Sequence, residues 1–132
     1  MRVTNDMSEF NNTQLSTLDA INRFNEAFGR HDVEGVMAAM TDDCVFENTY
    51  PPPDGARHVG QAAVRAAWED FFSSSPDATF TAEETFACDD RCIVRWRYNW
   101  VDHEGIPGYI RGVDIFRVEG GKVAEKLSYV KG

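Results

Sequence analysis

Basic residues are scarce in this sequence, which has 13 lysines and arginines against 22 aspartates and glutamates and a formal charge of -9 at pH 7. Nucleic acids and anionic membranes are bound through basic surface, so this balance argues against both as partners. The sequence also lacks the run of about 20 apolar residues that a membrane helix needs, and its N-terminus has no apolar core of signal-peptide length. We therefore expect a cytoplasmic protein that binds a neutral or weakly charged small molecule.

Cysteine is also scarce, and the three cysteines, Cys44, Cys88 and Cys92, form no C-x-x-C pair. An odd number without such a pair favours small buried apolar side chains in a reducing compartment over disulfides or metal ligands. The three histidines show no H-x-x-x-H spacing, and there is neither a glycine-rich phosphate loop nor a nucleophile elbow. The sequence predicts no metal site and no cofactor.

Apolar residues, by contrast, are plentiful enough for one folded domain. The chain has 132 residues, of which 42% are hydrophobic and 12% aromatic. This length and composition are typical of a single globular domain. Residues 1–12 are polar and aperiodic, so we expect a flexible N-terminal tail there and one domain over residues 13–132.

Hydrophobic periodicity divides this domain into helices followed by strands. Apolar spacings of three and four predict helices from about residue 15 to 28, from 33 to 40 after an N-cap at Asp32, and from 61 to 73. A short strand at 44–48 precedes a proline-rich loop. Four more strands, separated by short turns, predict an antiparallel meander at residues 78–88, 91–101, 109–118 and 122–130. The fold class is therefore α+β, with helices packed on one face of a sheet.

One strand carries an acid among apolar neighbours. In "RGVDIFRVEGGK", Asp114 lies on the same side as Phe116 and Val118, because successive strand side chains point to opposite faces. Trp96 and Tyr98 share a face of the preceding strand. An acid beside aromatics on one wall is typical of a small-molecule cavity. The aromatics alone would also suit an ordinary core, and the carboxylate would also suit a loop cap or a structural ion pair with arginine.

The opposite face of the same two strands carries Arg95, Arg97, Val113 and Ile115. Aliphatic residues flanked by arginine are suited to an interface, and such a patch would be a liability on a monomer. We expect a homodimer joined through this face.

Three segments in sequence order support a family assignment: "FNEAFGRHDVEGVMAAMTDDCVFEN", "VGQAAVRAAWEDFF" and "GVDIFRVEGGKVAEKLSYV". In this order and spacing, the chain from about Leu15 to Lys131 resembles the SnoaL-like polyketide cyclase and ketosteroid isomerase branch of the nuclear transport factor 2-like superfamily. The resemblance implies a cone, in which a curved antiparallel sheet wraps around three N-terminal helices and encloses a deep pocket.

The resemblance also implies roles for individual residues. Asp114 matches an acid that ketosteroid isomerases keep protonated to donate to an enolate oxygen, but their tyrosine donor falls on Phe24 and their general base on Asn48. Limonene epoxide hydrolases have an asparagine that matches Asn48 and holds the attacking water, whereas their final-strand aspartate falls on Ser128. SnoaL-like cyclases place an Asp or His base at the position of Asp114, and they match best.

We therefore expect a cofactor-independent enzyme of isomerase or cyclase type that acts on an apolar carbonyl or ring-containing compound. Asp114 would be its acid/base and Asn48 would orient the substrate or a water. The residues expected to shape the ligand site are Phe24, Tyr50, Trp68, Trp96, Tyr98 and Ser128. The alternative is a non-catalytic ligand-binding or dimerisation module on the same fold, which the missing partner groups at Phe24 and Asn48 favour.

Overall fold

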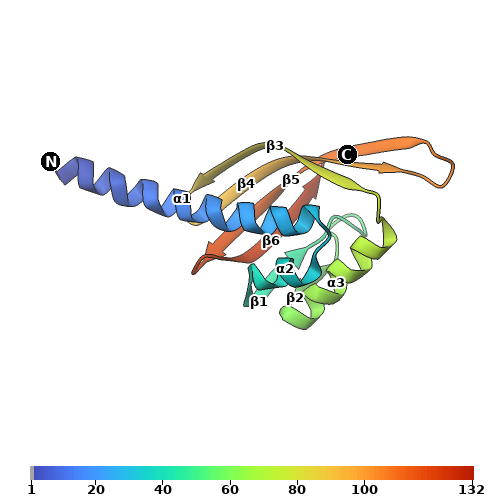
Figure 1. The fold of residues 1–132 in the computed structure, drawn as a ribbon, viewed down its shortest axis with the longest axis horizontal. Helices are drawn as coiled ribbons and strands as arrows, with labels where there is room; N and C mark the ends of the chain where they lie inside the picture. The colour runs from blue at the N-terminus through green and yellow to red at the C-terminus, as the bar shows by residue number, and fades with distance from the viewer. Residues whose placement is uncertain (1) are drawn as a thin grey trace.

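The computed structural model describes the backbone of residues 2–132 and the side chains of residues 13–132. Helices and strands follow one another in the order expected for an α+β domain (Figure 1). The elements are α1 (Arg2–Gly29), α2 (Val33–Ala38), β1 (Met40–Glu47), β2 (Arg57–Val59), α3 (Gln61–Ser74), β3 (Thr79–Cys88), β4 (Arg91–Val101), β5 (Pro107–Glu119) and β6 (Lys122–Val130). No helix in the described part of the chain is long and apolar enough to span a bilayer.

Helix α1 crosses the sheet and contacts β3 to β6, whereas α3 packs against β1 and β2 (Figure 1). The buried face of α1 includes Ile21, Phe24 and Phe28, which recur at the spacing that predicted the helix. The helix begins at Arg2, earlier than the periodicity indicates. The predicted flexible tail over residues 1–12 falls on residues whose side chains lie outside the described part, and it stays a prediction. The N-cap of α2 is confirmed, since the Gly35 amide donates to Asp32 Oδ1 at 3.0 Å.

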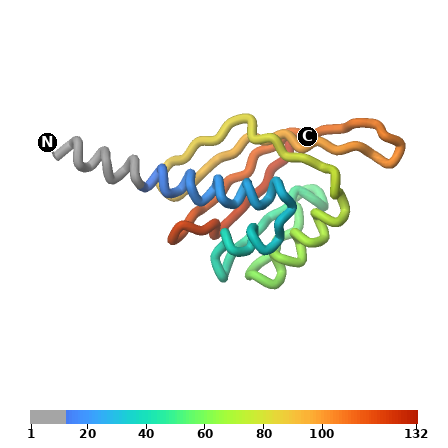
Figure 2. Tube along the Cα trace, in the orientation of Figure 1, coloured from blue at the N-terminus to red at the C-terminus, as the bar shows by residue number. Residues whose placement is uncertain are grey.

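The six strands form one sheet in the order β2-β1-β6-β5-β4-β3. Strands β3 to β6 form the predicted antiparallel meander, and the β4–β5 hairpin extends beyond the helices (Figure 2). One pairing departs from the antiparallel sheet that the resemblance implies, because β1 lies parallel to β6 with Glu47 opposite Leu127. The parallel pairing brings the C-terminal ends of β1 and β6 to the same end of the sheet. Asn48 and Ser128 therefore come close together.

The proline-rich loop also ends differently from the prediction. Its last residues form β2, which pairs antiparallel with β1 and places Val59 opposite Val45. The prolines at 51–53 lack amide donors and stay outside the ladder, whereas Arg57–Val59 retain theirs. The loop is therefore attached to the sheet at both ends, where it borders the site described below.

The predicted faces of β4 and β5 are confirmed by burial. On β4, Trp96 is buried with Cys92 and Val94, and on β5 Asp114 and Phe116 are buried. Trp96 lies opposite Gly112 in the neighbouring strand, where an added Cβ would come within 2.5 Å of the indole ring. Glycine at 112 therefore makes room for the Trp96 side chain. The cysteine prediction holds for Cys44 and Cys92, but Cys88 is exposed at the end of β3.

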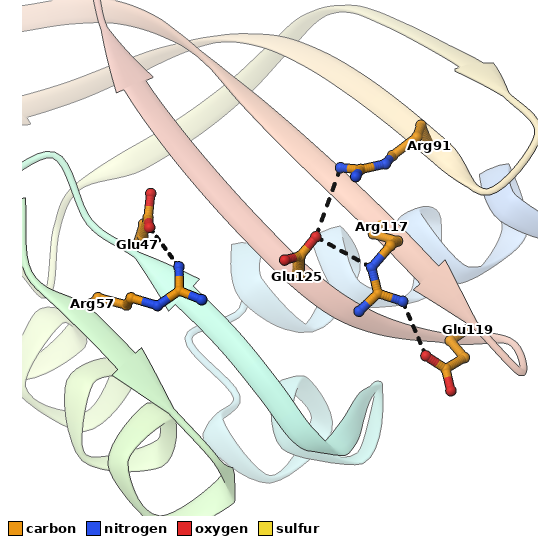
Figure 3. Close-up of polar contacts among 6 residues, drawn as sticks. All are labelled: Glu47, Arg57, Arg91, Arg117, Glu119 and Glu125. Atoms are coloured by element: carbon orange, nitrogen blue, oxygen red, sulfur yellow. Dashed lines mark hydrogen bonds and ion pairs between the residues drawn. The ribbon is translucent and has the colours of Figure 1, made fainter. Parts of the chain in front are cut away.

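The outer face of the sheet carries arginine–glutamate ion pairs (Figure 3). Glu125 on β6 lies 3.2 Å from Arg117 on the adjacent strand β5 and 3.7 Å from Arg91 on β4, the strand beyond it. Arg57 pairs with Glu47 at 2.6 Å on β2 and β1. All of these side chains are partly exposed, so each pair contributes little to stability. The arginines of this face are thus neutralised largely within the chain.

Candidate functional site

A polar group of three side chains, two of them buried, lies on the inner face of β5 and β6. Asp114 and Lys126 are each only 5% exposed. Lys126 Nζ lies 3.3 Å from Asp114 Oδ2 and donates to Ser128 Oγ at 2.9 Å, and Ser128 Oγ donates to Asp114 Oδ1 at 2.7 Å. Strand register explains the cluster, since Asp114 pairs with Ser128 and Lys126 lies two residues earlier on the same face. The carboxylate thus has an ionic partner inside the protein, and that partner is a lysine.

The Lys126 ammonium lies among aromatic rings from three elements. Its Nζ is 4.9 Å from the ring centre of Phe46 on β1, 5.4 Å from Trp68 on α3 and 5.5 Å from Phe28 on α1. Burial lowers the pKa of Lys126 by penalising the charged form, and the charge and hydrogen bond of Asp114 oppose this shift. The amine therefore releases its proton more readily than a surface lysine does.

Two cavities border Lys126. The larger, which we call the aromatic cavity, has a volume of about 220 Å³. The smaller, which we call the aspartate cavity, has a volume of about 110 Å³ and includes Asp114. Both cavities are lined by Phe28, Phe80, Trp96 and Lys126, so these four side chains lie between the two spaces. The aromatic cavity is lined by Phe28, Phe46, Asn48, Thr49, Tyr50, Trp68, Phe71, Phe80, Trp96, Tyr98, Ile110, Lys126 and Ser128.

A third cavity, of about 470 Å³, lies where β1 and β6 end beneath the proline-rich loop. We call it the polar cavity, because Glu47, Asp54 and Arg57 are among its lining residues. It shares Asn48 and Ser128 with the aromatic cavity, so the two spaces adjoin at this edge. An apolar interior space therefore borders a polar one.

Two buried donors beside the aromatic cavity lack acceptors. Trp68 Nε1 and Trp96 Nε1 are buried and have no hydrogen-bond partner among the described residues. Both tryptophans line the aromatic cavity. Buried donors in folded proteins are almost always satisfied, so an unpaired pair of them calls for an explanation. A ligand with an oxygen acceptor in this cavity would supply one.

The predicted site residues occupy these spaces in two groups. Asp114 and Phe24 line the aspartate cavity, and Phe24 is fully buried. The residues of the prediction that line the aromatic cavity are Asn48, Tyr50, Trp68, Trp96, Tyr98 and Ser128. Of these, Tyr50 is 73% exposed, and the Asn48 side-chain oxygen accepts the Thr49 amide at 2.8 Å. The geometry brings these residues together, and their functional roles stay predictions.

Lys126 is the site residue that sequence reasoning missed. The segment "KVAEKLSYV" contained a signal for it, because Lys126 has the same parity as Ser128 and the opposite parity to Glu125. Pairing with β5 places Lys126 opposite the buried Phe116. A lysine at an inner-face position requires a buried partner, and Asp114 was the available acid.

Comparison with known proteins identifies the family. The model of the SnoaL-like domain matches residues 21–126. The chain belongs to the SnoaL-like domain family. The predicted resemblance to the nuclear transport factor 2-like superfamily is confirmed, and the matched segment contains both Asp114 and Lys126. Comparison with curated protein sequences gives no match.

Solved structures support the same assignment for this SnoaL-like domain. An NTF2-like protein of unknown function from Mesorhizobium loti is 39% identical, with a TM-score of 0.77 over 90% of this chain and 93% of that one. The Mycobacterium tuberculosis protein RV0760c, in complex with estradiol-17beta-hemisuccinate, is 27% identical, with a TM-score of 0.72 over 86% and 92%. A candidate polyketide cyclase from Xanthomonas campestris pv. campestris, 17% identical with a TM-score of 0.73 over 90% and 93%, shares the fold.

Proposed function

We propose that this SnoaL-like protein is a cofactor-independent enzyme of isomerase or cyclase type that acts on an apolar carbonyl or ring-containing compound. Asp114 is the proton-transfer acid/base in this proposal. The observation that carries it is the hydrogen bonding of the buried Asp114 and Lys126 with the half-buried Ser128, beside a cavity lined mostly by aromatic rings. Ligand sites typically combine such an apolar lining with a few placed polar groups.

The lining and volume of the aromatic cavity support a small ring-containing ligand. About 220 Å³ is below the range of roughly 300–1,000 Å³ typical of drug-sized ligands. A compound with one or two rings suits this space, and the adjoining polar cavity has room for a polar extension. The unpaired indole donors of Trp68 and Trp96 suit a ligand with a carbonyl oxygen. The ligand in the RV0760c complex, estradiol-17beta-hemisuccinate, also joins an apolar ring system to a polar end.

The proton path follows from the hydrogen bonds. Asp114 does not line the aromatic cavity, but Ser128 does, and its hydroxyl donates to Asp114 Oδ1 at 2.7 Å. A proton taken from the ligand by Ser128 Oγ is therefore passed to Asp114 as the serine proton moves along the existing hydrogen bond. The nearby Lys126 ammonium stabilises the enolate oxygen that forms. Positioned acid–base groups of this kind contribute about 10²–10⁴-fold to rate.

Proton exchange in D₂O tests this proposal without the physiological substrate. We choose 2-indanone, an apolar ring ketone with exchangeable α protons, and follow their replacement by deuterium with NMR. Wild-type protein should accelerate exchange, and Asp114→Asn, which keeps the side-chain shape, should remove about 10²-fold or more of that acceleration. Binding of 2-indanone, measured by tryptophan fluorescence, should be retained in the variant. Equal exchange by the wild type and Asp114→Asn would disprove the acid/base role.

The second candidate is a non-catalytic ligand-binding module. Phe24 is fully buried and offers no hydroxyl donor, and the Asn48 side-chain oxygen is already bonded to its own loop. Both observations favour binding without catalysis. In that case 2-indanone would bind, but its α protons would exchange no faster than they do without the protein. The exchange and fluorescence measurements together therefore separate the two candidates.

We also propose that the protein is a homodimer joined through the outer face of the sheet. Arg95 on this face pairs with Glu84 at 3.0 Å, and Arg97 stacks over Tyr109 with its guanidinium 3.7 Å from the ring centre. Arginines that already have partners within the chain, beside half-exposed tyrosines, Tyr109 at 51% and Tyr129 at 53%, make a surface rich in the residue types that interfaces prefer.

A further inference from the structure

We propose that Lys126 Nζ is a nucleophilic amine that forms an imine with the carbonyl carbon of a ligand held in the aromatic cavity. This covalent step differs from proton transfer by Asp114, and the acid/base proposal does not require it. It rests on the proposed function in one respect, that the ligand carries a carbonyl group.

The position of Lys126 supports this role. The side chain is 5% exposed and lines both the aromatic cavity and the aspartate cavity. Phe28, Phe46 and Trp68 surround the amine with rings from α1, β1 and α3. Asp114 on β5 is the charged group in contact with it. A lysine desolvated in an apolar site is the standard way to activate an amine for Schiff-base formation.

A purely stabilising role does not explain the buried Asp114–Lys126 ion pair well. Removing two charges from water is costly, and replacing a buried pair by apolar residues of similar volume is often neutral or stabilising. A purely structural position opposite Phe116 would be served by an aliphatic side chain. Retaining an amine there, next to a cavity and a proton acceptor, instead suits a reactive group.

The three side chains supply every proton transfer that the reaction needs. Lys126 gives a proton to Asp114, which leaves a neutral amine and a neutral carboxyl group 3.3 Å apart. The amine attacks the carbonyl carbon, a C–N bond forms, and a proton moves from nitrogen to the former carbonyl oxygen through Ser128. The Asp114 carboxyl group then protonates the resulting hydroxyl, the C–O bond breaks, water leaves, and the nitrogen lone pair completes the C=N bond. Starting from the ammonium and a carbonyl compound, the products are a protonated imine and one water.

The composition of the chain makes the test simple. The sequence has three lysines, Lys122, Lys126 and Lys131, and the other two are exposed. The full chain is incubated with benzaldehyde and sodium cyanoborohydride, which reduces an imine to a stable amine, and the modified residue is found by peptide mass spectrometry. We expect labelling at Lys126 to exceed that at Lys122 or Lys131 by about tenfold, because desolvation enlarges the neutral fraction only at the buried amine. Labelling confined to the exposed lysines or the N-terminal amine would overturn the inference.

Benzaldehyde has no α proton, so trapping is independent of the exchange assay. Benzyl alcohol, which cannot form an imine, measures binding alone through tryptophan fluorescence. Binding of both compounds without a Lys126 adduct would overturn the inference and leave the proposed function intact. Loss of binding for both would count against both proposals, because an aromatic ring compound is the proposed ligand class.

Matched variants complete the design. Lys122→Arg and Lys131→Arg should leave the Lys126 adduct unchanged. Lys126→Met should abolish it, and the paired variant Asp114→Asn with Lys126→Met keeps the site neutral if the single substitution prevents folding. The location of the adduct in the wild-type chain decides the question whether or not these variants fold.

Discussion

Asp114 Oδ2 lies 3.3 Å from Lys126 Nζ, and the two side chains are almost completely buried. Ser128 bonds to both partners and gives each a second polar contact. A buried ion pair is tolerated when its remaining hydrogen-bonding capacity is used, as it is here. The pair, together with Ser128, thus places an acid, an amine and a hydroxyl beside the aromatic and aspartate cavities.

The buried pair should respond strongly to the loss of one partner. Lys126→Met leaves the Asp114 carboxylate without its counter-charge, and breaking a buried pair in this way costs about 3–5 kcal/mol. The double variant Asp114→Asn with Lys126→Met should recover most of this loss, because no unpaired charge remains. Urea unfolding measures both. Arg65→Met is the control, since it breaks the partly exposed Arg65–Glu34 pair outside the proposed interface and should cost no more than about 1 kcal/mol.

The three cysteines should differ in reactivity in the folded protein. Cys92 is fully buried and burial raises its pKa to about 11, and Cys44 is also buried with a raised pKa. Cys88 is exposed. A thiol-specific reagent at pH 8 should therefore modify Cys88 alone, and all three cysteines should react after unfolding. Rapid native labelling of Cys92 would contradict the buried position of that strand residue.

The raised pKa of Cys92 also predicts a pH dependence. The folded state holds its thiol proton more tightly than the unfolded state, whose ordinary value is 9.0. The contribution of the Cys92 thiol to stability is therefore fully present below pH 9 and is lost as pH rises towards 11. The free energy of unfolding should fall over this interval in the wild type and fall less in Cys92→Ala. Unfolding curves measured at several pH values would show the difference.

Strand parity explains why part of the site was predictable. Alternation within β5 placed Asp114 on the buried face, and alternation within β4 placed Trp96 on the same wall, since both signals are local. The parallel pairing of β1 with β6 was not predictable in this way, because it joins segments about 80 residues apart. Lys126 was missed for a related reason. Lysines in strands usually extend their charge to solvent, so the pattern of β6 did not indicate a buried amine without its neighbours.

Glycine 112 should control the shape of the aromatic cavity. In Gly112→Ala the new Cβ would meet the Trp96 ring at 2.5 Å and the Tyr129 carbonyl at 2.3 Å, so the indole and the backbone must shift. Overpacking of this kind costs about 1–3 kcal/mol. Benzyl alcohol should bind more weakly, as fluorescence titration would show. The control is Gly132→Ala, where an added Cβ has no neighbour within 4 Å and binding should stay unchanged.

The proposed homodimer predicts a molecular mass in solution and the position of the interface on the sheet. Light scattering at micromolar concentration should give twice the chain mass of 14.9 kDa. Val113→Asp places a charge in the middle of the outer face and should shift the protein to a monomer, because an unpaired charge in an interface core is costly. Val59→Asp is a suitable control, since Val59 is 59% exposed on the short edge strand β2. A single-chain mass for the wild type would contradict the proposal.

Substitution of Ser128 should show whether protons pass from the ligand to Asp114 directly or through the Ser128 hydroxyl. The hydroxyl lines the aromatic cavity and bonds to Asp114 at 2.7 Å, whereas Asp114 itself lines the other space. Ser128→Ala removes the relay, and we expect the exchange of 2-indanone protons to fall by about 10²-fold, at the lower end of general acid–base effects. Binding of 2-indanone should change little, because the hydroxyl is already bonded within the protein. Ser128→Thr restores a hydroxyl at the same position and should recover most of the exchange rate. If Ser128→Ala exchanges protons as fast as the wild type, Asp114 must reach the ligand directly, which requires the ligand to enter the aspartate cavity past the four side chains that line both cavities.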